Sequence, residues 1–84
     1  MLAPAKRIPL TNDEANELLA LAKYLRPGER MIYHTGYLAK DRCDDGALAW
    51  LAAELLGLAA AGRLRLYQRG FGAQGVYQYI AEGR

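Results

Sequence analysis

Apolar residues recur at helical spacing in two stretches of the chain. In the first, the apolar positions lie three or four residues apart, which predicts a helix with one apolar face: Leu18, Leu21, Ala22 and Leu25. Thr11 and Glu14 have the spacing of a capping box, so the helix should begin there, and Pro27-Gly28 should end it.

The second stretch predicts a longer, alanine-rich helix. Its core-facing stripe is Leu48, Leu51, Leu55 and Leu58. Asp44 or Asp45 should cap its first turn, and Gly62 follows its last residue, Ala61, as a C′ glycine. Its opposite side, with Ala49, Trp50, Ala53, Glu54 and Gly57, is apolar apart from Glu54.

Between these helices, residues 31–34 are β-prone and predict a brief strand. Thr35 should then cap a short helix from Gly36 to about Asp41, with Tyr37 and Leu38 turned inward, and residues 42–44 should form a turn.

The last part of the chain alternates with period two and predicts a β-hairpin. One face of the first strand is mostly aliphatic, with Leu64, Leu66 and Gln68. The other face is basic, with Tyr67 among three arginines: Arg63, Arg65 and Arg69. Residues 70–75 hold three glycines and should form the turn, and residues 76–80 should form the returning strand.

Together these elements predict a single α+β domain over residues 11–84, in the order α-β-α-α-β-β, preceded by an extended arm over residues 1–10. The order resembles the winged-helix family, a helix-turn-helix variant, over about residues 11–81. Its local signs are residues 58–64 at the end of the long helix and the Tyr77-Gln78-Tyr79 strand. Residues 28–36 and 38–42 also resemble stretches of short phage and prophage proteins. The family resemblance implies a hairpin wing and a third helix that enters the DNA major groove.

The distribution of charge along the chain indicates where an anion could bind, which the overall composition does not. The 84 residues carry a formal charge of only +2, but residues 63–84 hold four arginines against Glu82. Any anion-binding surface should therefore belong to the hairpin. Cys43 is the only cysteine, which excludes a disulfide within the chain and favours a cytoplasmic protein. Residues 1–7 lack the apolar core of a signal peptide, and no stretch is long enough for a membrane span.

Little in the sequence indicates catalysis. His34, Cys43 and Asp41 could form a nucleophilic triad, but a strand-end histidine bonded to backbone or to Thr35 is the favoured interpretation. Asp41, Asp44 and Asp45 lack the ligand spacing of a calcium loop, and capping of the long helix explains Asp44 or Asp45. Gly70, Gly72 and Gly75 are followed by a strand rather than a helix, which excludes a phosphate-binding nucleotide loop. We therefore expect no enzyme, metal, cofactor or small-molecule substrate.

Two binding functions remain. The first is a small DNA-associated accessory or regulatory protein of phage type, which contacts phosphates of duplex DNA non-specifically through Arg63, Arg65, Tyr67 and Arg69. Residues 46–62 hold no Arg, Lys, Asn, Gln, Ser or Thr to read base edges, and their only polar side chain is Glu54, so sequence-specific recognition is not expected.

The second is a protein-interaction module, either a homodimer or a binder of a host protein, that uses Trp50, Ala53, Glu54 and Phe71. Two alternatives stay open: the arm or the first helix could cover Trp50, and Phe71 could fold back on the sheet.

Overall fold

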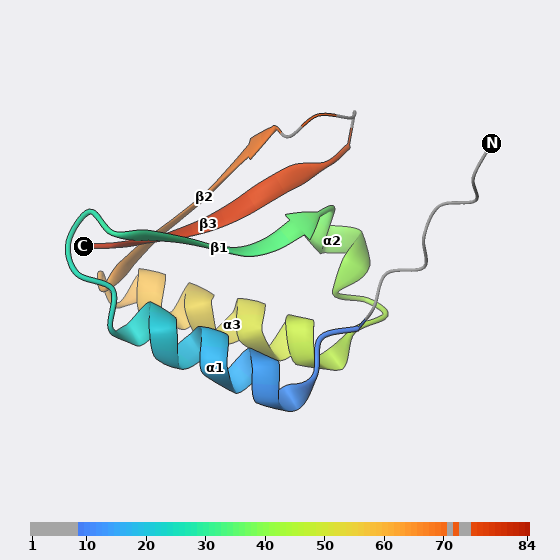
Figure 1. The fold of residues 1–84 in the computed structure, drawn as a ribbon, viewed down its shortest axis with the longest axis horizontal. Coiled ribbons are helices and arrows are strands. Elements are labelled where there is room, and N and C mark those ends of the chain that lie inside the picture. The colour runs from blue at the N-terminus through green and yellow to red at the C-terminus, as the bar shows by residue number, and fades with distance from the viewer. Residues whose placement is uncertain (1–8, 71, 73–74) are drawn as a thin grey trace.

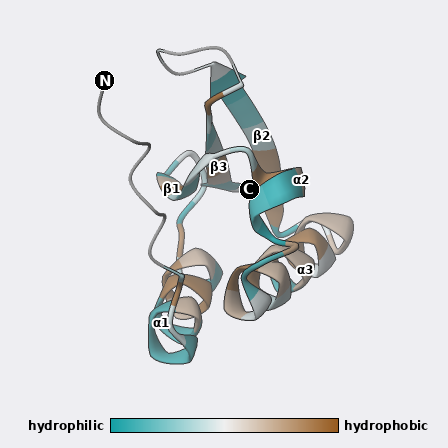
Figure 2. Ribbon diagram, turned by 90° about the vertical axis from the view of Figure 1, so that its right-hand side faces the viewer, coloured by the Kyte–Doolittle hydropathy of each residue, from teal (hydrophilic) through white to brown (hydrophobic). Residues whose placement is uncertain are grey.

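Two layers make up the part of the chain that the structure, a computed structural model, describes: residues 9–70, 72 and 75–84. One layer is an antiparallel sheet of three strands, and the other is a pair of helices on one of its faces (Figures 1 and 2). A third, one-turn helix follows the first strand. The elements in chain order are α1 (Asn12–Lys23), β1 (Arg30–Gly36), α2 (Leu38–Asp41), α3 (Gly46–Ala60), β2 (Leu64–Gly70) and β3 (Tyr77–Gly83). The predicted α+β class is confirmed.

The sheet has the order β1-β3-β2, so β3 lies in the centre and pairs with both neighbours. Its side chains alternate between a face toward the helices and a face away from them. Tyr79 and Ala81 point to the helix side, where they join Leu64 of β2 and Tyr33 of β1 in the core. From α3, Leu48, Leu51 and Leu55 are buried, as their spacing predicts.

The helices α1 and α3 lie side by side beneath the sheet and run in the same direction (Figure 1). Their first turns are neighbours, because Asn12, Asn16 and Trp50 line one hollow. Their last turns are also neighbours, because Ala22 and Leu58 line another. Both C-terminal helix ends therefore meet at one end of the molecule.

Helix α1 begins as predicted but buries a different set of residues. The capping box is present, since Thr11 accepts the Glu14 N–H and the Glu14 carboxylate accepts the Thr11 N–H. Ala15, Leu19 and Ala22 face the core, whereas Leu21 is 59% exposed. The helix also ends at Lys23, with Tyr24 as its cap, before the predicted stop.

The segment after α1 departs most from the prediction. Strand β1 extends to Gly36, so Thr35 lies in the strand and does not cap a helix. Helix α2 begins one residue after Tyr37, which makes no side-chain cap and is 51% exposed rather than turned inward. The longer strand is favoured because each added residue pairs with β3, up to Gly36 opposite Tyr77.

Strand β3 likewise runs beyond its predicted end, to Gly83, where the chain packs against the turn after α1. Gly28 donates its N–H to the Gly83 carbonyl, and Gly83 donates to the Glu29 carbonyl. A Cβ atom at Gly83 would collide with the carbonyl oxygen of Arg26. Only glycine lets these two backbones approach so closely.

We expect Gly83→Ala to lower the free energy of unfolding by about 1–3 kcal/mol, because the added methyl group must displace backbone. Urea unfolding followed by circular dichroism measures this change. Gly70→Ala is the matched control, since a Cβ there meets nothing within 4 Å. Equal effects of the two substitutions would contradict the close approach.

Burial of Tyr33 also makes the free energy of unfolding depend on pH in the alkaline range. Desolvation, and then the nearby Tyr79, raise the pKa of Tyr33 above the ordinary value. The contribution of the buried, protonated Tyr33 to the free energy of unfolding is thus complete below about pH 10 and is lost as the pH rises toward its folded-state pKa.

Tyr33→Phe should therefore make the free energy of unfolding fall less steeply above about pH 10. Denaturant unfolding at a series of alkaline pH values measures this slope. Tyr24→Phe, at a ring that is 85% exposed, should keep the original profile. An unchanged slope in Tyr33→Phe would count against the raised pKa.

Candidate functional site

The sheet face that points away from α1 and α3 gathers the arginines of two strands. On β2, Arg65, Tyr67 and Arg69 alternate with the inward Leu64 and Leu66. The register sets these outward residues opposite Glu82, Ile80 and Gln78 of β3, and Glu82 and Ile80 in turn face Arg30 and Ile32 of β1. We call this surface the open face: Arg30, Ile32, Thr35, Arg65, Tyr67, Arg69, Gln78, Ile80 and Glu82.

The open face is positively charged because its three arginines meet one carboxylate. Arg30 Nε lies 3.8 Å from Glu82 Oε1, an exposed pair that adds little stability. The guanidinium of Arg65 stacks over the Tyr67 ring, 5.5 Å from its centroid, and Arg69 Nε donates to Gln78 Oε1 at 2.7 Å. Two positive charges therefore remain uncompensated on this face.

Tyr67 connects the outer strands β1 and β2 on the open face. Its hydroxyl accepts a long hydrogen bond, 3.5 Å, from Arg30 Nη1. This bond, followed by electrostatic attraction to Tyr67 and Glu82, raises the pKa of Arg30 above its already high ordinary value. Arg30 of β1 and Arg65 and Tyr67 of β2 thus form one contact group that reaches across the central strand β3.

A shallow hollow of about 340 Å³ lies on the same face. Arg30 and Arg69 flank it, and Ile32 and Ile80 contribute apolar surface. Guanidinium groups around an apolar floor can hold a phosphate while a sugar or base lies against the floor.

Sequence reasoning missed Arg30 and Ile32 as parts of this surface. The alternation within β1 is interrupted, because the register shifts between Ile32 and His34 and leaves Tyr33 as an extra inward residue. Such a bulge has no signature in the sequence of this strand, so the outward positions of β1 could not be assigned.

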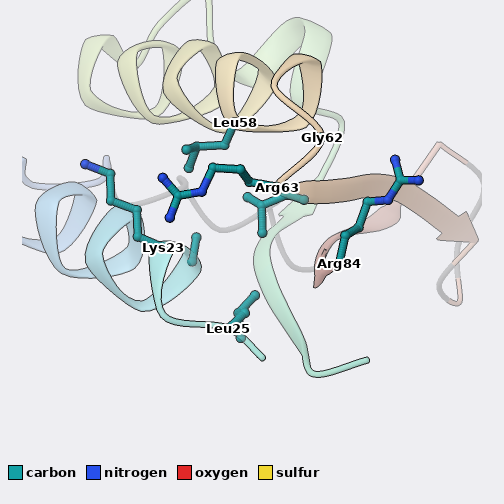
Figure 3. Close-up of a pocket in the computed structure, with 8 residues that line it drawn as sticks. Lys23, Leu25, Leu58, Gly62, Arg63 and Arg84 are labelled. Atoms are coloured by element: carbon teal, nitrogen blue, oxygen red, sulfur yellow. The ribbon is translucent and has the colours of Figure 1, made fainter. Parts of the chain in front are cut away.

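Arg63 does not share the open face with Arg65 and Arg69, contrary to the alternation prediction. Strand β2 begins only at Leu64, and the Arg63 side chain lies between the ends of α1 and α3 (Figure 3). There it lines a pocket of about 230 Å³ with Lys23 and Leu58, while the head of Arg84 points elsewhere. The turn after Gly62, at φ 78°, changes the direction of the chain before the strand starts.

The predicted protein interface lies on the other side of the molecule, on α3. Trp50 is 40% exposed beside Asn12 and Asn16 of α1, so the first helix borders the indole without burying it. Ala53 and Glu54 are also exposed. Phe71, the fourth residue predicted for this interface, lies outside the described residues, as do Lys6 and Arg7 of the arm.

The His34 ring is bonded to Asp41, with 2.8 Å between Nε2 and Oδ2. The same carboxylate oxygen accepts the Tyr37 N–H, and a Cβ at Gly36 would meet it at 2.5 Å. Cys43 instead donates its thiol to the Ala39 carbonyl. The pair thus joins the end of β1 to α2, and the contacts do not bring Cys43 to the histidine as a triad requires.

The acidic cluster behaves as helix capping predicts, and the structure distinguishes its members. Asp45 is 3% exposed, and its carboxylate accepts the Leu48 N–H at 3.0 Å and the Leu10 N–H at 2.8 Å. Asp44 is exposed. Within the described ranges, no three His, Cys, Asp or Glu side chains are grouped to hold a metal ion.

Comparisons of the chain with protein-family models, curated proteins and solved structures found no match. Over residues 9–70, 72 and 75–84, none of the helices has the length and apolar character to cross a bilayer.

Asp45→Ala should lower the free energy of unfolding by about 2–3 kcal/mol, because two backbone N–H groups lose a charged acceptor. Asp44→Ala should change it by less than about 0.5 kcal/mol. Chemical denaturation of the two variants side by side measures the difference. Similar losses in both would mean that the cluster acts as a unit rather than through one cap.

Proposed function

We propose that this chain is a small, non-enzymatic accessory protein that binds the phosphate backbone of DNA through the open face. The observation that carries this proposal is the placement of Arg30, Arg65 and Arg69, from two strands, on one sheet face together with a single carboxylate, Glu82. Cations that remain uncompensated on an exposed sheet attract phosphates by charge and by release of their counterions.

The contact we propose is independent of base sequence. The described face of α3 that points away from the sheet carries Trp50, Ala53, Glu54 and small apolar residues, and has no Arg, Lys, Asn, Gln, Ser or Thr with which to read base edges. This helix covers one face of the sheet (Figure 2), and the strand register directs the arginines to the other face. One duplex therefore could not contact both surfaces, as a groove-reading helix with a wing would require.

We also propose a relation to the winged-helix architecture. The element order, with the sheet order β1-β3-β2 and a terminal hairpin, supports it. The resemblance of residues 28–42 to short phage proteins supports an accessory or regulatory role. In this proposal the hairpin keeps the phosphate contact of a wing, whereas α3 has no groove-reading role.

Removing Arg65 or Arg69 should weaken binding to a short duplex and lower the slope of log affinity against log salt by about one each. Fluorescence anisotropy from about 50 to 200 mM salt measures this slope. Arg63→Ala is the matched control, because its side chain points away from the open face and its loss should leave the slope unchanged.

Two results would contradict the proposed function. One is no retention of DNA at about 50 mM salt, where phosphate contacts are strong. The other is a change of slope in Arg63→Ala as large as that in Arg65→Ala, which would assign the contact to the helix ends.

A further inference from the structure

The outward side of α3 carries a line of apolar positions at coiled-coil spacing. These positions are separated by four, three, four and three residues, and all of them are exposed: Gly46, Trp50, Ala53, Gly57 and Ala60. This spacing keeps side chains in one seam along a helix. The seam extends over about 22 Å, the length of α3.

We propose that a second copy of this chain covers the seam, with the two α3 helices antiparallel. In that orientation the one bulky side chain of the seam, Trp50, faces a glycine of the partner helix, which leaves space for it. When Trp50 lies opposite the partner's Gly57, the two-fold axis falls between Ala53 and Glu54. A Cβ placed at Gly57 meets nothing within 4 Å, so there is room for the indole ring. Small residues along the seam let the helix axes approach to about 8 Å.

Charge complementarity favours the same antiparallel orientation. Asp44 directly precedes α3, and Arg63 follows it; both are exposed. Neither side chain makes an ion pair within the described residues. In this antiparallel orientation the end of α3 next to Asp44 lies beside the partner's end of α3 next to Arg63, twice in the dimer. A parallel pair would instead set like charges together at both ends.

The one charged side chain of α3 is compatible with this arrangement. Glu54 lies at the flank of the seam and opposite the partner's Ala53, not opposite the partner's Glu54. The helix face therefore holds a central apolar contact with opposite charges at its two ends, the pattern of a specific interface.

The test is the mass of the whole chain in solution without DNA, by sedimentation over a wide concentration range. The mass should rise from 9.3 kDa toward twice that value. Gly57→Gln should abolish this rise while leaving the fold intact, because the new side chain enters open space and glutamine favours a helix over glycine. Ala39→Gln, at an exposed alanine of α2, is the control that should dimerise normally.

Charge exchange tests the orientation. Asp44→Arg should weaken the dimer, and adding Arg63→Asp to it should restore the dimer, because opposite charges then face each other again. Trp50 is the only tryptophan, so its quenching by iodide should fall with concentration in the native chain and not in Gly57→Gln.

Three results would overturn the proposal. If the native chain stays at 9.3 kDa at every concentration, it does not dimerise through the seam. The seam then binds a different protein or, if Trp50 is protected from iodide, is covered by another part of the same chain. If Gly57→Gln dimerises as strongly as the native chain, the interface must lie on another surface. An unchanged dimer in Asp44→Arg rejects the antiparallel register. Because DNA is absent, none of these results bears on the open face.

Discussion

Burial of one face of the sheet against two helices is the constraint on which the rest of this structure depends. A chain of 84 residues buries only about 60% of its unfolded surface, and here the core is formed between one side of the sheet and the helix pair. Tyr33, Tyr79 and Leu64 point into that layer. Since successive strand residues point to opposite faces, the same pairing directs Arg65, Tyr67 and Arg69 to the other side.

This sidedness separates the two candidate binding surfaces. The strand register places the arginines on the open face, while Trp50 and the seam of α3 lie on the outer side of the helix layer. A second copy bound to the helix layer would leave both open faces free and directed outward. In combination, the two proposals describe a dimer that could hold two DNA segments at once, a geometry suited to bridging rather than to reading an operator.

Local signals located the elements well, and the errors have physical causes. The capping box at Thr11 and the leucine stripe of α3 involve residues three or four apart, so the sequence displays them directly. Strand β1 is longer than predicted because its added residues pair with residues of β3 that lie 41 to 52 positions later in the chain. Leu21 has helical spacing but faces solvent, since the direction of the sheet relative to α1 decides which side is buried.

The sequence by itself determined the helices, the hairpin and the basic character of β2, because helical spacing and strand alternation act between near neighbours. It also led to the expectation that α3 does not read base edges. Only the tertiary structure decided which charged groups meet: the bulge at Tyr33 brings Arg30 beside Glu82, and the turn after Gly62 sends Arg63 away from Arg65. It likewise selected Asp45 over Asp44 as the cap. These outcomes depend on register and on contacts between distant segments, which no local pattern encodes.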